Sequence, residues 1–288
     1  MFRIMDIINK ADEMHHVVAK ARTKGLTIGF IPTMGALHPG HLSLMEKSVK
    51  AGNYTIVSIY VNPAQFNDKT DFVRYPRSLK KDVELISKIK CDVVFAPDDA
   101  EIYPKPDNRI FDFGYLDKIM EGKYRPGHFS GVAKVVSRLF DIVKPDIAYF
   151  GEKDFQQLAI IREMVKKLNY QVNITGCPIF REPDGLAMSS RNMLLTPEMR
   201  RFSPAIYQAL KKAEEFVFLK PVDECKKIVI SEIEKNTRLK TEYFEIVDND
   251  SLEPLTQWNY EKPARGCVAV YAGEIRLIDN FLYHFNKS

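Results

Sequence analysis

Segment 27–52 constrains the fold of this chain more than any other. It overlaps a short, uncharged, apolar run at 26–31, which is typical of a buried parallel strand. Pro32 is expected to end that strand. Apolar residues at helical spacing then continue from Pro39 until Gly52 supplies a C-cap. The segment therefore predicts a buried strand, a tight turn and a helix in immediate succession.

Two histidines, His38 and His41, lie at the start of the expected helix. Because a residue before proline avoids the helical region and proline suits the first helical position, His38 is expected to be the N-cap. Both imidazoles then lie beside the unpaired N–H groups and the positive dipole end of the helix, and Gly40 leaves the approach open. The pattern favours a phosphate site. The alternative is that both are ordinary cap or surface histidines.

Strands and helices are expected to alternate through the first part of the chain. Apolar runs predict further strands at 54–61, 93–96, 147–150 and 172–174, and helical patterns fall at 11–22, 78–90, 132–143 and 155–168. Segment 121–131 is glycine-rich and aperiodic, and is expected to be a functional loop that includes Arg125 and His128. The alternation predicts an α/β fold, a doubly wound (Rossmann-like) parallel sheet domain over residues 1–177.

The remaining residues, 178–288, are expected to form a second, smaller α+β domain. Thr196 and Ser203 each precede a proline, which predicts two helix starts, and a third helix is expected at 222–235. Runs at 243–247, 267–271 and 275–278 predict the strands of a small mixed sheet.

Composition limits the classes of protein to consider. The 288 residues are 45% hydrophobic, which is enough for a sizeable core. The net charge of +4 is spread along the chain, so a focused surface for nucleic acid is not expected. Charged residues interrupt the N-terminal apolar run and no later run is long enough to cross a bilayer, which predicts a cytoplasmic protein without membrane contact. The 4 cysteines are scattered and are interpreted as reduced and structural.

A second candidate phosphate site follows the strand expected at 147–150. It consists of Gly151, Glu152, Lys153 and Asp154, at the sheet edge where ligands of open α/β sheets gather. Lys153 suits a phosphate, and Asp154 suits a ribose hydroxyl. The alternative is a solvated helix start with Asp154 as its N-cap.

A third candidate site lies in the polar connection to the second domain. It consists of Met188, Ser189, Ser190 and Arg191. Two hydroxyls and an arginine can hold a polyphosphate, and charge-assisted bonds from Arg191 strengthen as charge moves onto the leaving group. The alternative is that both serines are turn or cap residues.

Three neutral amides, Asn62, Gln65 and Gln157, fall near the ends of expected strands. Such groups suit a substrate that carries hydroxyls and a carboxylate, because amides pair with both without the desolvation penalty of a charge. Each is also a common loop residue. No cluster of acidic and histidine residues has metal-ligand spacing, so no protein ligand for a metal is named.

Several blocks of this sequence resemble a known family. PTMGALHPGH at 32–41 is similar to the His-x-Gly-His signature of the adenylate-forming nucleotidyltransferase superfamily, and in full to that of the pantothenate synthetase family. The other blocks follow in that family's order and span nearly the whole chain: VNPAQF at 61–66, EGKYRPGHFSGV at 121–132, GEKDFQQL at 151–158, REPDGLAMSSRN at 181–192 and EIRLIDN at 274–280.

The resemblance implies an ATP-dependent ligase that condenses (R)-pantoate with β-alanine through a pantoyl adenylate, giving pantothenate, AMP and diphosphate. It also implies a cytoplasmic homodimer. Mg²⁺ is expected to accompany ATP, and closure of a lid-like second domain is a hypothesis for how water is expelled from the adenylate. His41 would be the proton donor, with His38, Lys153 and Arg191 as the other catalytic residues. Gln65 would contact both substrates and Gln157 would hold pantoate, while Asn62 remains a substrate-binding candidate from the amide pattern alone.

The residues that the resemblance assigns to ATP are drawn from the three candidate sites and one further position. They are Met34, Gly35, Ala36, Leu37, His38, Pro39, Gly40, His41, Gly151, Glu152, Lys153, Asp154, Phe180, Met188, Ser189, Ser190 and Arg191. Phe180 stands where the family often has a valine that contacts adenine through its backbone, so that contact is expected from a bulkier residue.

Two alternative functions differ in what they require. A nucleotidyltransferase that acts on a phosphate ester would share the first motif but would not need β-alanine. A non-enzymatic nucleotide-binding or RNA-binding protein would show salt-sensitive binding and no turnover. The absence of a focused basic patch argues against the RNA-binding alternative.

Overall fold

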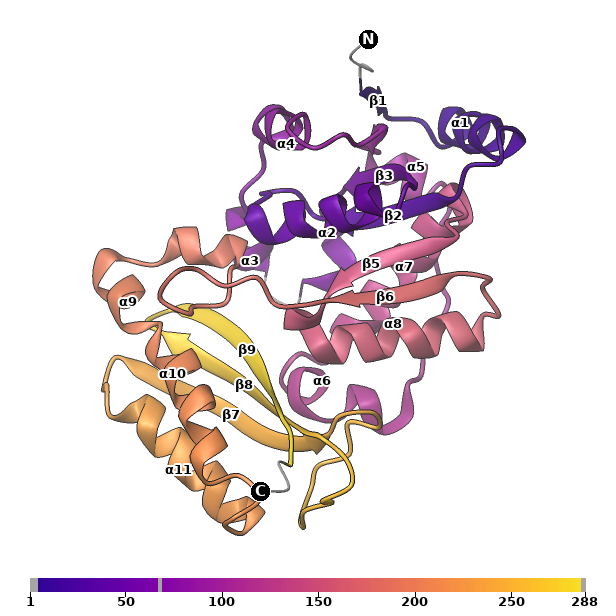
Figure 1. The fold of residues 1–288 in the computed structure, drawn as a ribbon. Helices are drawn as coiled ribbons and strands as arrows, with labels where there is room; N and C mark the ends of the chain where they lie inside the picture. Colours follow the sequence, from indigo (N-terminus) through magenta and orange to yellow (C-terminus); the bar gives the residue numbers. More distant parts are fainter. Residues whose placement is uncertain (1–4, 67–68, 286–288) are drawn as a thin grey trace. The chain divides into compact units, whose positions relative to one another are not determined.

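The computed structural model describes residues 5–66 and 69–285. The chain divides into two compact units. The first contains the residues up to Glu152 together with Gln156–Pro178, and the second contains Lys153–Phe155 together with the residues from Ile179 onward. Figure 1 shows a sheet with helices in each.

The first unit is built on a six-stranded sheet in the order β1-β4-β3-β2-β5-β6. Every neighbouring pair is parallel, which confirms the predicted α/β class. Its strands are β1 (Asp6–Ile8), β2 (Ile28–Thr33), β3 (Tyr54–Ile59), β4 (Val93–Phe95), β5 (Ile147–Gly151) and β6 (Asn173–Cys177). From β2 the chain builds the sheet in one direction through β3 and β4, and then returns to add β5 and β6 on the other side of β2. The switch point of the sheet therefore lies between β2 and β5.

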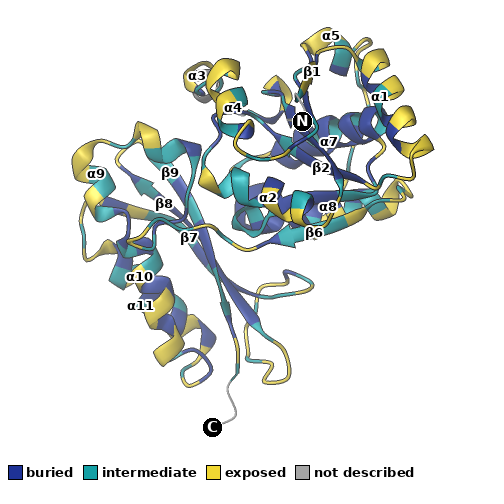
Figure 2. Cartoon of the chain, turned by 45° about the horizontal axis from the view of Figure 1, so that its top comes forward, coloured by how far each residue is buried: buried dark blue, intermediate teal, exposed yellow. Residues whose placement is uncertain are grey.

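Helices cover both faces of this sheet. They are α1 (Ala11–Thr23), α2 (Pro39–Lys50), α3 (Lys69–Arg74), α4 (Leu79–Ile86), α5 (Asp99–Ile102), α6 (Met120–Tyr124), α7 (His128–Val143) and α8 (Phe155–Lys167). Helices α1, α7 and α8 pack on the face that carries Phe30 and Ile56, while α2 and α4 pack on the face of Ile31 and Val57. Because neighbouring strand residues point to opposite faces, β2 and β3 are buried on both sides. Figure 2 shows this burial along the strands.

Some boundaries differ from those predicted. Strand β1 was not predicted, since three residues are too few for a clear pattern. Pro32 does not end β2 but pairs with Ser58 of β3. The register with β5 covers only Gly29 and Phe30, so the missing N–H of proline lies beyond that ladder. The helix expected at 78–90 ends at Ile86.

The loop predicted at 121–131 is wrong in most of its length. Helix α6 ends at Tyr124 and α7 begins at His128, so the connection consists of Arg125, Pro126 and Gly127 alone. Gly127 has φ 82°, which supplies the left-handed residue that this short connection needs. Glycines elsewhere in the segment lie inside helices, where they allow close packing.

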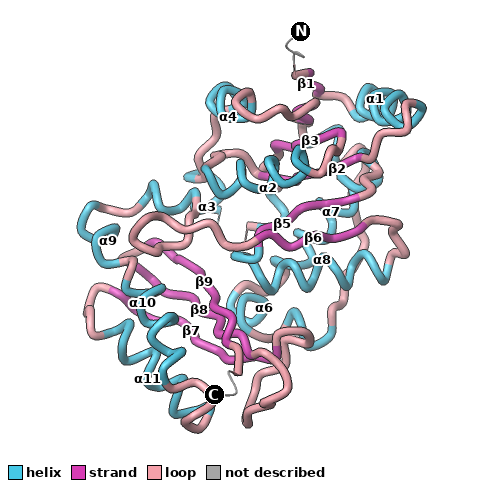
Figure 3. Tube along the Cα trace, in the orientation of Figure 1, coloured by secondary structure: helices cyan, strands magenta, loops and turns pink. Residues whose placement is uncertain are grey.

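The second unit has a three-stranded sheet in the order β7-β8-β9. Its strands are β7 (Leu239–Asp248), β8 (Ala264–Ala272) and β9 (Ile275–Tyr283), and both pairings are antiparallel, so the expected mixed sheet is corrected. Its helices are α9 (Pro197–Phe202), α10 (Ala205–Lys212) and α11 (Val222–Glu234). Helices α10 and α11 share one apolar core with the strands. Figure 3 shows the course of these two helices and of the three strands.

Candidate functional site

The two histidines occupy the positions that the sequence predicted. His38 is the extended N-cap of α2, and Pro39 is the first helical residue. The main-chain N–H of His38 donates to Nδ1 of His41 at 3.3 Å, and the ring centroids lie 3.9 Å apart. Because Nδ1 accepts, the proton of a neutral His41 is on Nε2. His41 therefore presents an N–H donor on the side of the ring away from the main chain.

A buried carboxylate that the sequence analysis missed supports the turn before these histidines. Asp82 of α4 accepts the N–H groups of Ala36 at 3.1 Å and Leu37 at 2.8 Å. Asp82 is 2% exposed, and this burial raises its pKa, with the two N–H groups acting in the opposite direction. The only available signal was an acidic residue in an otherwise amphipathic helix, which does not reveal its partner.

Backbone conformation explains why the turn contains glycine. Gly35 has φ 75° and Ala36 has φ 50°, both in the left-handed region. A Cβ on Gly35 would lie 2.8 Å from Oδ2 of Asp82. Glycine is therefore required at this position both for its conformation and for the close approach of the carboxylate. The N–H groups of Ala36 and Leu37 are directed at Asp82.

The second candidate site begins at the end of β5. Strands β2 and β5 are parallel neighbours, so Gly151 lies at the same edge of the sheet as the turn that follows β2. This edge is the switch point, where ligands of open α/β sheets bind. Lys153 groups with the second unit, where its carbonyl accepts from Nδ2 of Asn280 at 3.0 Å. Nζ of Lys153 lies 4.0 Å from Oδ1 of Asp154, and Glu152 is half-buried.

Gln65 lies beside the turn at residues 34–37 that precedes the two histidines, called the signature turn below. It is buried in the short 3₁₀ helix η1 (Pro63–Gln65), and its Nε2 donates to Sδ of Met34. Nδ1 of His128 lies 2.8 Å from the Gln65 carbonyl, which can only accept, so Nδ1 carries the proton. Arg125 donates to Nε2 of His128 at 3.1 Å. These two residues, expected on a functional loop, instead hold the main chain of Gln65.

Asn62 is completely buried and supports the same helix. Its Oδ1 accepts from the N–H of Ala64 at 3.3 Å and from the hydroxyl of Tyr103 at 3.1 Å, while Nδ2 donates to the Gly131 carbonyl at 3.1 Å. Its amide is therefore engaged by the protein. These contacts fix the position of η1.

Adjacent glutamines at the start of α8 have different surroundings. Gln156 is buried, and its amide bonds the carbonyls of Leu116 and Ile119 and the N–H of Glu121. Gln157, the residue chosen from the sequence, is half-buried. The buried glutamine thus fixes the connection before α6.

In the second unit, a hairpin brings Phe180 and Met188 together. The N–H of Met188 donates to the Phe180 carbonyl at 3.0 Å. The short 3₁₀ helix η4 (Ser190–Leu194) follows, with Oγ of Ser189 accepting from the N–H of Arg191 at 3.3 Å. Ser189 is thus a cap, as the alternative interpretation held, while Ser190 is buried and Phe180 exposed.

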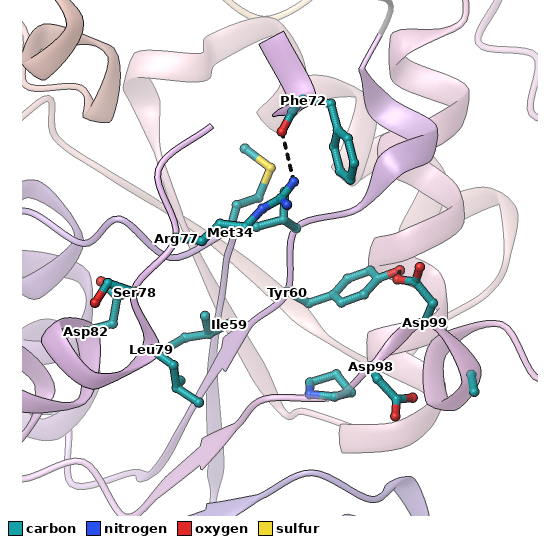
Figure 4. Close-up of a pocket in the computed structure, with 13 residues that line it drawn as sticks. Met34, Ile59, Tyr60, Phe72, Arg77, Ser78, Leu79, Asp82, Asp98 and Asp99 are labelled. Atoms are coloured by element: carbon teal, nitrogen blue, oxygen red, sulfur yellow. Dashed lines mark hydrogen bonds between the residues drawn. The ribbon is translucent and has the colours of Figure 1, made fainter. Parts of the chain in front are cut away.

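A cavity of about 620 Å³ lies beside the signature turn within the first unit. Met34 and Asp82 line it together with the end of β3 and the residues after β4, and Figure 4 shows Arg77 among them, donating to the Phe72 carbonyl. The other charged groups lining it are Asp98 and Asp99, and Asp99 accepts from the Tyr60 hydroxyl. With three carboxylates and one arginine, the cavity does not suit a triphosphate.

The described part of the chain also bears on metal and membrane binding. No group of three or more His, Cys, Asp or Glu side chains is arranged there to hold a metal ion. None of the helices in residues 5–66 and 69–285 combines the length and hydropathy that a membrane crossing requires. All four cysteines are buried and free.

The fold and the signature turn define a nucleotide-binding α/β enzyme, with paired imidazoles at a helix start beside the switch point of a parallel sheet. The family model described as pantoate-beta-alanine ligase matches residues 6–282. The chain belongs to this family and is a ligase of this type.

Relatives and solved structures agree with this assignment. A pantothenate synthetase from Phocaeicola vulgatus is 50% identical over 280 residues, covering 97% of this chain and 99% of that protein. One from Bacteroides thetaiotaomicron is 48% identical over 279 residues, with the same coverage of 97% and 99%. The crystal structure of a pantothenate synthetase from Thermus thermophilus has a TM-score of 0.88 at 40% identity, covering 96% of this chain and 99% of that one. A pantoate-beta-alanine ligase from Francisella tularensis, complexed with beta-gamma ATP and beta-alanine, has a TM-score of 0.81 at 36% identity, covering 97% and 98%.

Proposed function

We propose that this chain joins (R)-pantoate to β-alanine at the expense of ATP, with a pantoyl adenylate formed at the turn of His38 and His41. Family membership identifies the acid and the amine. The observation that carries the site assignment is the helix N-terminus at His38, where Nδ1 of His41 accepts a main-chain N–H, so that a neutral His41 carries its proton on Nε2. Such a terminus attracts phosphate oxygens.

The first step activates the acid. A carboxylate oxygen of pantoate attacks the α-phosphorus, a C–O–P linkage forms, and the bond to the bridging oxygen of diphosphate breaks. Negative charge moves onto the diphosphate. His41 donates its Nε2–H to a phosphate oxygen, and Lys153 and Arg191 add positive charge as the leaving group develops.

The second step forms the product. The amine of β-alanine, in its neutral form, attacks the acyl carbon and the C–N bond forms. The nitrogen then loses a proton to solvent, and AMP leaves as the bond between the acyl carbon and the phosphate oxygen breaks. The residues do little covalent chemistry, so placement dominates. We assign Gln65 and Gln157 to the substrates. Asn62, His128 and Arg125 fix Gln65 in place through the contacts described above.

We assign the adenosine part of ATP to the hairpin that contains Phe180 and Met188, and the phosphates to His38, Gly40, Lys153, Ser190 and Arg191. The second unit acts as a lid-like domain that excludes water from the adenylate. Magnesium accompanies ATP and takes its ligands mainly from phosphate oxygens and water, as this ion often does. The family resemblance supports a homodimer in the cytoplasm.

The test is AMP release with each substrate omitted in turn. The proposal expects release only when ATP, pantoate and β-alanine are all present. It also expects pantoate alone to support exchange of labelled diphosphate into ATP, because the first step is reversible. A nucleotidyltransferase acting on a phosphate ester would show no dependence on β-alanine. Exchange that is independent of pantoate would contradict an acyl adenylate.

A further inference from the structure

Asn280 of β9 connects two parts of the second unit that are distant in sequence. It is 2% exposed. Its Nδ2 donates to the main-chain carbonyl of Lys153 at 3.0 Å, and its Oδ1 accepts from Nη1 of Arg265 at 2.6 Å. A buried amide with both ends bonded has a single favourable orientation, so its contact with Lys153 is fixed.

The neighbouring arginine strengthens this attachment. The guanidinium of Arg265 lies 3.9 Å from the ring centroid of Phe155, two residues after Lys153. Nε of Arg265 also donates to Oδ1 of Asn249 at 2.9 Å. Arg265 is 6% exposed, and it therefore binds Asn280 and packs against the segment that Asn280 holds.

The strand beneath Asn280 is itself anchored. Asp279, the preceding residue, accepts Nη1 and Nη2 of Arg181 at 2.7 and 3.0 Å, and the same arginine donates to the Asn280 carbonyl at 3.2 Å. Adjacent side chains of a strand point to opposite faces. One face of β9 thus holds the hairpin that leads to Met188, and the other holds Lys153.

We propose that Asn280 is a positioning residue that sets the reach of the Lys153 ammonium toward the ATP phosphates. This inference rests on the proposed role of Lys153. A lysine side chain has a flexible four-carbon stem, so the location of its main chain decides which oxygen its charge can reach. When the Asn280 contact is lost, the protein still carries the Lys153 ammonium, but the ammonium is displaced from the phosphates. This displacement impairs the adenylation step.

The experiment compares Asn280→Asp and Asn280→Ser in the full-length protein. Asn280→Asp keeps the size and the acceptor for Arg265 but loses the donor to Lys153, and Asn280→Ser is uncharged and too short to reach. We expect both to lower pantoate-dependent diphosphate exchange by about 10- to 100-fold, as small displacements of reacting groups do. The KM for β-alanine should change less than about twofold.

Tyr283→Phe is the matched control. Tyr283 lies on the same strand, is 2% exposed, and donates its hydroxyl to the Leu210 carbonyl at 2.9 Å. We expect Tyr283→Phe and the Asn280 variants all to lower Tm. Tyr283→Phe should nevertheless leave exchange within about twofold of wild type. Equal losses of exchange in all three variants at equal losses of Tm would overturn the positioning role.

A double-mutant cycle with Lys153→Ala separates this inference from the proposed function. If Asn280 acts through Lys153, Asn280→Asp should cause no further loss of exchange in the Lys153→Ala background. Wild-type exchange in Lys153→Ala would overturn both the role of Lys153 and the positioning by Asn280. Loss of exchange in Lys153→Ala with normal exchange in both Asn280 variants would overturn the positioning alone.

Discussion

The main-chain N–H of His38 donates to Nδ1 of His41 at 3.3 Å, so the helix cap itself selects the tautomer of the second imidazole. An ordinary capping residue satisfies only the backbone. Here the same bond leaves an N–H donor on Nε2 of His41, beside a helix N-terminus that attracts anions. The hydrogen bond that caps the start of α2 thus also sets the tautomer of the proposed proton donor.

We predict that His41→Ala lowers pantoate-dependent diphosphate exchange by about 100- to 1,000-fold, the usual loss when a donor to a developing charge is removed. His41 is half-buried and lies in the first turn of α2, so Tm should change little. The exposed His16 of α1 gives a matched control, and His16→Ala should retain full exchange. Near-normal exchange in His41→Ala would remove this residue from the mechanism.

Asp82 gives a second prediction. Asp82→Ala removes the acceptor of two buried N–H groups, those of Ala36 and Leu37, and should lower the free energy of unfolding by about 1–3 kcal/mol. Because the turn loses its support, exchange should fall as well. Urea unfolding measures the first effect, with exposed Glu84→Ala of the same helix as the control. Unchanged stability and exchange would show that the turn does not depend on this carboxylate.

The pH dependence of stability tests the burial of the same group. Burial raises the pKa of Asp82 above its usual value of 3.8, while the N–H groups of Leu37 and Ala36 act in the opposite direction. Between the two pKa values the folded protein binds more protons than the unfolded chain, so the contribution of Asp82 to stability is lost as pH rises through its folded pKa. The stability of wild type relative to Asp82→Asn should therefore fall as the pH rises above about 4. A relative stability that rises over this range would contradict the sign.

Local patterns in the sequence were sufficient to predict the sheet class and the start of α2. Apolar runs indicated the strands, and the pair of Pro39 and His38 indicated the helix cap, because both signals act over a few residues. The partners of Asp82 could not be predicted, since Ala36 and Leu37 lie more than forty residues earlier in the chain. The contact between Asn280 and Lys153 could not be predicted for the same reason, because the two residues are distant in sequence. Side-chain packing in the folded protein brings together both Asp82 with its partners and Asn280 with Lys153.

The glycines at 121–131 led to the wrong prediction of a loop. One of them, Gly131 of α7, instead allows η1 to approach the helix closely, which gives another prediction. A Cβ on Gly131 would lie 2.3 Å from the Ala64 carbonyl oxygen and 2.9 Å from Cα of Gln65. Gly131→Ala should therefore move η1 away from α7 and raise the KM for pantoate by about tenfold or more. Ser130→Ala, one residue earlier and half-buried, is the control and should leave the KM within about twofold. A normal KM in Gly131→Ala would show that η1 can shift without affecting Gln65.

Gly185 controls the hairpin in the second unit that carries Phe180 and Met188. Its φ is 92°, and a Cβ would lie 2.2 Å from Cδ1 of Tyr207, whose ring also packs under the Arg181 guanidinium. Gly185→Ala therefore combines backbone strain with overpacking, and should lower the free energy of unfolding by about 1–3 kcal/mol. If the hairpin holds adenosine as proposed, the KM for ATP should rise while that for β-alanine stays unchanged.

The double variant Gly185→Ala with Tyr207→Ala removes the clash but not the strain, so it should recover part of the ATP affinity. If the double variant recovers no ATP affinity, the whole effect comes from the strain of the left-handed backbone at residue 185. An unchanged KM for ATP in the single variant would argue against adenosine at this hairpin.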